Sequence, residues 1–322
     1  EVWDYIRQWE NEGRVIVIKP SGEDTGIQSQ ALSPARIEIT APPQPGRKVP
    51  RGQEEPGRRN GQPARPLSRI IGETPEIQRL KKNIRRFAEM DCAIIIRGEI
   101  GTGKELVART IHALSRRRNQ RFLAFDCGCF SRDFRFAELV ASSDDASGND
   151  PLKKDGGTKN RPAFAGTILL DHIENMPRET QVEMLQLLDG KTDSPDSLMD
   201  IRFIVVAHQN LKEKISEGKF QNELYSRIRA IAIEIPPLRH RLDDLPMLCR
   251  YFLDQLNEDF EKRITTISED VFPVLEAYSF PGNIRELRHI IERAVLLSDT
   301  DIITEKHLPK RLSRKPAKTT PN

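Results

Sequence analysis

The sequence predicts an α/β sandwich with a parallel sheet, followed by a small all-helical domain. Between Ile70 and Ile235, short apolar runs alternate with segments whose apolar residues recur at helical spacing. Strands that are apolar on both faces are typical of a parallel sheet covered by helices. One of these strands runs directly into a glycine-rich loop that opens a helix. After Pro236 and Pro237 only helical spacing remains, which predicts the second domain.

Each element follows from a local pattern of this kind. Strands are expected at 93–97, 122–125, 167–170, 201–207 and 231–235, where apolar residues dominate. Helices of the first domain are expected at 74–90, 105–114 and 181–188. Helices of the second domain are expected at 242–260, 268–278 and 284–297.

The segments that flank these elements have a different composition. Prolines and polar residues dominate from Pro20 to Pro66, and such a segment cannot bury enough apolar surface to offset the entropy of ordering it. We therefore expect five parts: a short helix and strand at 1–18, a disordered linker at 19–66, the α/β domain at 67–240, the helical lid domain at 241–309 and a basic tail at 310–322.

Composition excludes several classes of function. The 51 basic and 48 acidic residues give a net charge of only +3, which provides no global argument for nucleic-acid binding. No apolar stretch approaches the roughly 20 residues of a membrane span, and no signal peptide opens the chain. The four cysteines form no C-x-x-C pair. We expect a cytoplasmic protein with reduced thiols and no cysteine metal site.

A phosphate-binding loop is the most specific motif. The apolar strand at 93–97 leads into Gly98, Glu99, Ile100, Gly101, Thr102, Gly103, Lys104 and Glu105. Glycines let backbone N–H groups close around phosphate oxygens, and Lys104 can reach the β- and γ-phosphates of a nucleotide. Glu105 stands where a Ser or Thr usually binds Mg²⁺. ATP with Mg²⁺ is therefore the expected cofactor.

The strand at 167–170 supplies the second part of a nucleotide site. It ends in Asp171, the carboxylate expected to hold Mg²⁺ near the phosphates. The next residue would normally be a Glu that polarises the attacking water, but here it is His172. His172 could act as a general base, and Glu174 is a second alternative. We favour a third interpretation, in which hydrolysis is weakened or lost.

Taken together, the motifs from about Leu67 to Leu308 resemble the AAA+ ATPase domain of the bacterial sigma-54 transcription activators. The resemblance runs through Ile71-Gly72, the loop 98–105, the segments 166–171, 202–211 and 220–227, Pro236-Pro237-Leu238-Arg239 and the run from Pro281 to Leu287. It covers about three quarters of the chain, with the motifs in the family's order. The family also commonly carries Glu at the position of Glu105.

The resemblance implies roles for particular residues. Lys104 and its loop would hold the phosphates, and Asp171 would hold Mg²⁺. His208 would be the first sensor of the γ-phosphate, and Arg285 the second sensor, in the lid. Arg227 would reach into the neighbouring subunit's site as an arginine finger, which implies a homo-oligomeric ring, typically a hexamer.

Four departures from the family pattern limit what the resemblance implies. The remodelling loop G-A-F-T-G-A should follow Phe136, but residues 142–160 are polar and contain no aromatic. Gln221 replaces a second arginine. The family's Glu–Asn pair becomes His172 and Asp126, which could form a charge-assisted hydrogen bond. The expected helix-turn-helix is not found after the lid, so we expect no direct DNA binding through this chain.

The sequence thus predicts an ATP-binding AAA+ regulator of transcription with impaired or altered hydrolysis, which does not remodel sigma-54 directly. Two alternatives stay open. One is an active ATPase that remodels a different partner, with His172 or Glu174 as its base. The other is a pseudo-ATPase scaffold whose nucleotide is structural only. If the chain is a regulator of transcription, its expected partners are components of the transcription machinery.

Overall fold

The computed structural model describes residues 66–130, 134–136, 164–189, 199–208 and 211–312. Several predicted features lie outside these residues: the element at 1–18, the linker up to residue 65, the polar segment 142–160 and the tail beyond residue 312. The described residues form two compact units. One contains Glu89–Ile95 and His112–Ala232; the other contains Ile96–Ile111, the described residues before Glu89 and those after Ala232.

A five-stranded sheet forms the α/β part, in the order β2-β3-β4-β1-β5. The strands are β1 (Ile94–Arg97), β2 (Arg121–Asp126), β3 (Phe164–Asp171), β4 (Met199–Ala207) and β5 (Ala232–Glu234). β3 pairs in parallel with β2 on one side and with β4 on the other. The predicted α/β class and parallel sheet are confirmed.

The register of these strands positions polar residues at one edge of the sheet. Asp126 at the end of β2 lies opposite Asp171 at the end of β3. Leu170 lies opposite Val205 in β4, which ends two residues later at Ala207. In parallel strands the carboxyl ends meet at the same edge. Asp126, Asp171 and His208 therefore come together although the chain separates them widely.

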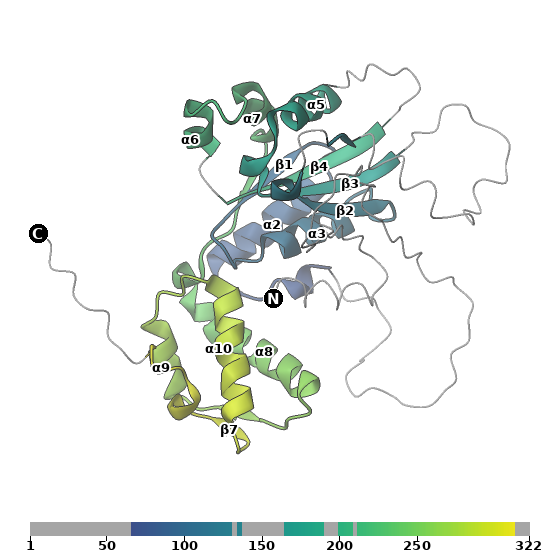
Figure 1. Ribbon diagram of the computed structural model, residues 1–322. Coiled ribbons are helices and arrows are strands. Elements are labelled where there is room, and N and C mark those ends of the chain that lie inside the picture. Colours follow the sequence, from purple (N-terminus) through teal and green to yellow (C-terminus); the bar gives the residue numbers. More distant parts are fainter. Residues whose placement is uncertain (1–65, 131–133, 137–163, 190–198, 209–210, 313–322) are drawn as a thin grey trace, which may run out of the picture. The chain divides into compact units, whose positions relative to one another are not determined.

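Three helices of the first unit pack beside these strands: α5 (Arg178–Leu188), α6 (Leu211–Ser216) and α7 (Asn222–Ile228) (Figure 1). Their buried residues join the apolar faces of β2, β3 and β4 in one core, which includes Phe136, Ile168, Met184, Phe203 and Leu224. The sequence predicted α5 but not α6 and α7, because six or seven residues are too few to establish helical periodicity.

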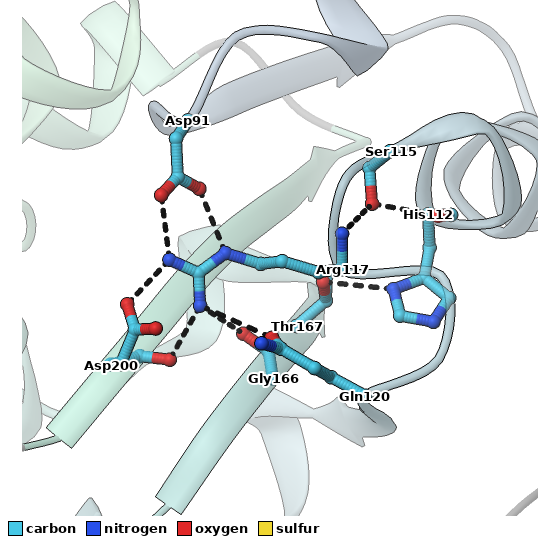
Figure 2. Close-up of polar contacts among 8 residues, drawn as sticks. All are labelled: Asp91, His112, Ser115, Arg117, Gln120, Gly166, Thr167 and Asp200. Atoms are coloured by element: carbon cyan, nitrogen blue, oxygen red, sulfur yellow. Dashed lines mark hydrogen bonds and ion pairs between the residues drawn. The ribbon is translucent and has the colours of Figure 1, made fainter. Parts of the chain in front are cut away.

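At the amino-terminal side of the strands, Arg117 organises a polar network (Figure 2). Its Nε and a terminal nitrogen donate to both carboxylate oxygens of Asp91, at 2.8 and 2.6 Å. The guanidinium also donates to the Asp200 backbone oxygen at 2.7 Å and to its carboxylate at 2.5 Å. Nearby, His112 Nδ1 lies 2.9 Å from Thr167 Oγ1. Arg117, itself buried, thereby joins the residues before β1 to the start of β4.

The second unit contains α2 (Pro75–Ala88) and the residues after Ala232. In α2, Ile77, Leu80, Ile84 and Ala88 are buried. Glu76 lies in its first turn and Arg85 and Arg86 in its last, the order that complements the helix dipole. The C-terminal part has α8 (Leu245–Asp259), α9 (Val271–Glu276) and α10 (Asn283–Leu297), with α8 beside α10 (Figure 1).

The C-terminal helices share one apolar core, to which Leu253, Phe280, Leu287 and Ile291 contribute. Two short strands, β6 (Thr266–Ile267) and β7 (Ile302–Ile303), pair in parallel. The sequence did not predict them. The helical character of this region is as predicted. Within the part of the chain that the structure describes, no helix is long and apolar enough to cross a membrane.

Candidate functional site

The loop Gly98–Glu105, called the phosphate loop below, connects β1 to α3 (Lys104–Leu114). Gly101 and Gly103 have φ angles of 78° and 94°, in the left-handed region that favours glycine. These two residues turn the chain sharply before the helix begins. The loop and the first turn of α3 together present backbone N–H groups and the positive end of a helix dipole, the arrangement that binds phosphate.

Lys104 lies inside this loop. Its side chain is only 6% exposed, and Nζ donates to the carbonyl oxygens of Gly98 and Glu99 at 2.8 and 2.9 Å. The hydroxyl of Thr102 also donates to the Glu99 carbonyl, at 2.8 Å. The ammonium group is thus held at the concave side of the loop backbone, where it can exchange carbonyl oxygens for phosphate oxygens. Glu105, by contrast, pairs with Arg109 on the exposed side of α3 at 2.6 Å.

A second network joins the phosphate loop to the start of α10. The Glu99 carboxylate accepts hydrogen bonds from the guanidinium of Arg239 at 2.6 and 2.8 Å and from the side-chain amide of Asn283 at 3.2 Å. Hydrogen bonds from Arg239 and then Asn283 lower the pKa of Glu99 to about 2. Asn283 also donates to the Ile100 carbonyl at 3.0 Å and accepts from the backbone N–H of Leu238 at 2.8 Å.

Close backbone contact accompanies this network. The N–H of Arg285 donates to the Gly101 carbonyl at 3.3 Å. A Cβ at Gly101 would collide with the carbonyl oxygen of Gly282. The phosphate loop therefore lies too close to the backbone at Gly282 for any side chain at position 101. Arg285 is therefore beside the phosphate loop by its backbone, while its side chain is exposed.

In the first unit, Asp171, His172 and His208 form a compact group, called the acid–histidine cluster below. His208 Nε2 lies 2.7 Å from Asp171 Oδ1, and His172 Nδ1 lies 3.9 Å from the same oxygen. The two imidazole rings stack with centroids 4.1 Å apart and planes 12° apart. His172 has φ 50° and ψ 46°, and its N–H donates to Asp171 Oδ1 at 2.9 Å. This left-handed turn places the His172 ring on the His208 ring.

Two further carboxylates approach the acid–histidine cluster. Asp126 Oδ2 lies 3.2 Å from His172 Nδ1, the pair for which the sequence suggested a charge-assisted hydrogen bond. The two atoms do not form a hydrogen bond, because His172 Nδ1 has no hydrogen-bond partner among the residues that the structure describes. Glu174 is buried, and its carboxylate accepts the backbone N–H of His208 at 3.4 Å.

The charge of Asp171 follows from this environment. Burial alone raises the pKa of Asp171, but the hydrogen bond from His208 and the charges of His208 and His172 act in the opposite direction and lower the net pKa below its ordinary value. The carboxylate is therefore ionised at neutral pH and available to a cation. Its side chain keeps 39% exposure at the strand end.

Arg227 lies on α7, apart from these contacts. Its side chain is 56% exposed and pairs with Asp189, after the end of α5, at 2.8 Å. Gln221, at the N-terminal cap of α7, donates its backbone N–H to the side chain of Gln181. The structure thus brings Asp171, His172 and His208 together in one unit and the phosphate loop and Arg285 together in the other.

Sequence reasoning missed Asn283 and Arg239 as site residues. Both lie inside motifs that the sequence analysis had singled out, so the signal was present but was assigned to neighbouring residues. A fully buried Asn with φ 51° at the first residue of a helix cannot be inferred from composition. Its role depends on contacts with Leu238 and Ile100, which are distant in sequence.

Two family models match the chain in succession. One, described as the sigma-54 interaction domain, matches residues 70–234. The other, described as the AAA+ ATPase lid domain, matches residues 239–322.

Curated relatives include transcriptional regulators. The C4-dicarboxylate transport transcriptional regulatory protein DctD of Rhizobium meliloti is 36% identical over 70% of this chain and 50% of its own length. The transcriptional regulatory protein ZraR of Klebsiella oxytoca is 34% identical over 79% of this chain and 58% of its own length. The chain thus spans little more than half the length of these relatives.

Solved structures agree with the fold. NtrX from Brucella abortus, in complex with ATP, is 30% identical and superposes with a TM-score of 0.62 over 78% of this chain and 57% of NtrX. A RuvB mutant from Thermotoga maritima is 12% identical with a TM-score of 0.52 over 77% of this chain and 71% of RuvB. The likeness to RuvB shows the fold alone.

Proposed function

Because the chain belongs to the sigma-54 interaction domain family of AAA+ ATPases, we propose that it binds ATP and acts as a nucleotide-dependent regulator of transcription with weakened or absent hydrolysis. It acts in the cytoplasm, where it binds a component of the transcription machinery. Its partner is a component other than sigma-54, because the sequence offers no G-A-F-T-G-A loop.

The observation that carries ATP binding is the position of Lys104. Its buried ammonium group donates hydrogen bonds of 2.8 and 2.9 Å to two carbonyl oxygens of the phosphate loop, which leads into α3. This geometry supports binding of a triphosphate, since it combines a fixed cation with convergent N–H groups. The ATP complex of NtrX, a 30% identical relative, supports the same ligand.

Mg²⁺ fits this proposal through Asp171. In nucleotide sites the ion takes one or two carboxylates and completes its octahedral shell with phosphate oxygens and water. Asp171 is ionised and 39% exposed at the end of β3, so it supplies that carboxylate. Bound Mg²⁺ neutralises phosphate charge; the chain's own contribution is the carboxylate and the ammonium group of Lys104.

Weak hydrolysis follows from the groups around the attacking position. The residue after Asp171 is His172, whose ring stacks on His208. Glu174, the other candidate base, is buried and accepts the His208 N–H, so its carboxylate is not free to activate water. We therefore expect ATP hydrolysis with His172 or Glu174 as the base to be slower than hydrolysis with a positioned Glu.

A second candidate function, an active ATPase, is favoured by one contact. Asp126 lies 3.2 Å from His172 Nδ1, and a carboxylate beside an imidazole can orient the ring. If His172 is a general base, His172→Ala will abolish the residual phosphate release. If it is not, that substitution will leave the rate unchanged.

Calorimetry with purified protein, ATP and Mg²⁺ tests binding, and steady-state phosphate release tests hydrolysis. We expect saturable ATP uptake that Lys104→Ala abolishes, while the exposed-lysine control Lys212→Ala retains it. We expect little phosphate release. No ATP uptake by the unmodified protein overturns the proposed function, and Lys104-dependent turnover of about one per second overturns weakened hydrolysis.

A further inference from the structure

We propose that Asp171, His172 and His208 form a binding site for a divalent transition metal of the Zn²⁺ class. This site is distinct in chemistry from the Mg²⁺·ATP binding proposed above, because two of its three ligands are imidazoles. All three residues lie in the same unit of the structure.

Geometry is the first argument. One ligand atom from each of the three residues lies within 4.8 Å of the other two. Ligand atoms around tetrahedral Zn²⁺ stand about 3.3 Å apart, as follows from bond lengths near 2.0–2.1 Å. His208 Nε2 and Asp171 Oδ1 are already 2.7 Å apart, and His172 Nδ1 is 3.9 Å from that oxygen. For all three atoms to coordinate one ion, the two stacked rings have to tilt apart, so that the lone pairs of both nitrogens converge.

The backbone conformation of His172 brings its ring next to His208. A histidine directly after a strand residue in extended conformation would point away from its predecessor, since side chains alternate along a strand. The left-handed conformation of His172 (φ 50°, ψ 46°) reverses this direction and stacks its ring on His208. Left-handed conformations of non-glycine residues are uncommon and often mark functional sites.

An unused polar atom is the second argument. His172 Nδ1 is buried and has no hydrogen-bond partner within the described ranges. Leaving a buried polar atom unpaired costs about 1–3 kcal/mol. Coordination satisfies His172 Nδ1 directly. At His208, the metal takes the place of the hydrogen bond between Nε2 and Asp171 Oδ1, and the neutral ring carries its proton on Nδ1.

The donor set selects the class of metal. Imidazole nitrogen binds Zn²⁺, Co²⁺, Ni²⁺ and Cu²⁺ well, whereas Mg²⁺ prefers oxygen ligands. The carboxylate of Asp171 supplies one negative charge, and that of Asp126, 3.2 Å from His172 Nδ1, adds another at the edge of the site. The side chains of Asp171 and His172 retain 39% and 38% exposure, so an ion can enter and keep a water ligand.

The test uses the full chain without nucleotide. Titration with Co²⁺, followed by visible d–d absorption, and with Zn²⁺, followed by competition with a chelating dye, gives stoichiometry and affinity. We expect one ion per chain and a tetrahedral Co²⁺ spectrum without a thiolate charge-transfer band. We expect His172→Gln and His208→Gln each to weaken binding tenfold or more.

Three control variants make the outcome unambiguous. His289→Gln, at an exposed position of α10, and Cys129→Ser, at an exposed cysteine near Asp126, should bind the metal as the unmodified protein does. Lys104→Ala should also retain the metal, so failure of ATP binding does not affect this test. The proposal is overturned if the unmodified protein binds no tighter than a His172→Gln/His208→Gln double variant, or if Cys129→Ser removes the ion.

Discussion

His172 differs in both charge and shape from the Glu that the resemblance to the sigma-54 activators implies at this position. A glutamate there would extend a carboxylate toward an attacking water, whereas the imidazole of His172 lies flat on His208. Asp126, in turn, faces His172 Nδ1 across 3.2 Å. The two positions therefore form a pair, and changing one alone leaves the other without its complement.

Restoring both residues should restore hydrolysis. We expect His172→Glu, combined with Asp126→Asn, to raise steady-state phosphate release tenfold or more, because a positioned base contributes about 10²–10⁴-fold to rate. His172→Glu alone should give a smaller gain, since two carboxylates would then face each other. No gain in the double variant would place the limit elsewhere, for example at Gln221.

Asn283, at the start of α10, makes two hydrogen bonds to the phosphate loop and a third to the backbone of Leu238. We expect Asn283→Asp to lower the free energy of unfolding by about 2–3 kcal/mol, since it places a buried carboxylate against the Ile100 carbonyl and the ionised Glu99. Urea unfolding measures the stability, and calorimetry should show weaker ATP binding because the phosphate loop loses its support.

Asn257→Asp is the matched control for that substitution. Asn257 donates to the Ile264 carbonyl at 2.8 Å and accepts the Ile264 N–H at 3.1 Å, so the change removes the same kind of hydrogen bond. It should lower stability and leave ATP affinity unchanged. Equal loss of ATP affinity in both variants would contradict the role given to Asn283.

Arg117 connects elements at the other edge of the sheet. We expect Arg117→Met to lower the free energy of unfolding by about 2 kcal/mol, because Asp91 and the Asp200 carbonyl lose their donor while both carboxylates keep access to water. Arg118→Met, at an exposed neighbouring position, should change stability by less than about 0.5 kcal/mol. A loss no greater than that of Arg118→Met would show that the Arg117 network does not stabilise the fold.

The same network predicts a pH dependence. The hydrogen bond from Arg117 lowers the pKa of Asp91 below its ordinary value of 3.8. A carboxylate whose pKa is lower in the folded state stabilises the protein fully above the unfolded value, and this stabilisation is lost as pH falls through the folded value. We expect Asp91→Asn to flatten the decline of unfolding free energy below pH 3.8. An unchanged slope in urea titrations would contradict this.

At the scale of the whole molecule, the predicted role of Arg227 in contacting another chain can be tested. It is 56% exposed, with one ion pair to Asp189 at 2.8 Å. If ATP promotes a ring, sedimentation should show larger species with ATP than with ADP, and Arg227→Ala should abolish the difference. Arg229 is exposed and directly follows α7, and Arg229→Ala should retain the difference between ATP and ADP. Identical profiles with both nucleotides would count against a nucleotide-dependent assembly.

The sequence was sufficient for the fold class and the family, because both depend on local patterns. The apolar runs of β1 and β3 and the spacing of the phosphate loop are each visible within ten residues. The two-residue strands β6 and β7 carry no such pattern, and only tertiary pairing defines them. The domain boundaries and the roles of Arg227 and Arg285 stay predictions.

The candidate site was less predictable for the same reason. Asp171 was identifiable as the polar end of an apolar strand, but the stacking of His172 on His208 depends on a backbone reversal at one residue. Sequence alone suggested that Glu174 could serve as a base. Its burial and its bond to the His208 N–H result from the pairing of β3 with β4, which residue types do not specify.

The absence of space between Gly101 and Gly282 has a consequence for protein engineering. The two glycines are 181 positions apart in the sequence, yet the position of the Gly282 backbone leaves no room for a side chain at residue 101. A chimera that takes its C-terminal helices from a relative will therefore fold well only if the donor segment presents an equally thin turn. Recombination between such proteins has to treat the two glycines as a single inherited feature.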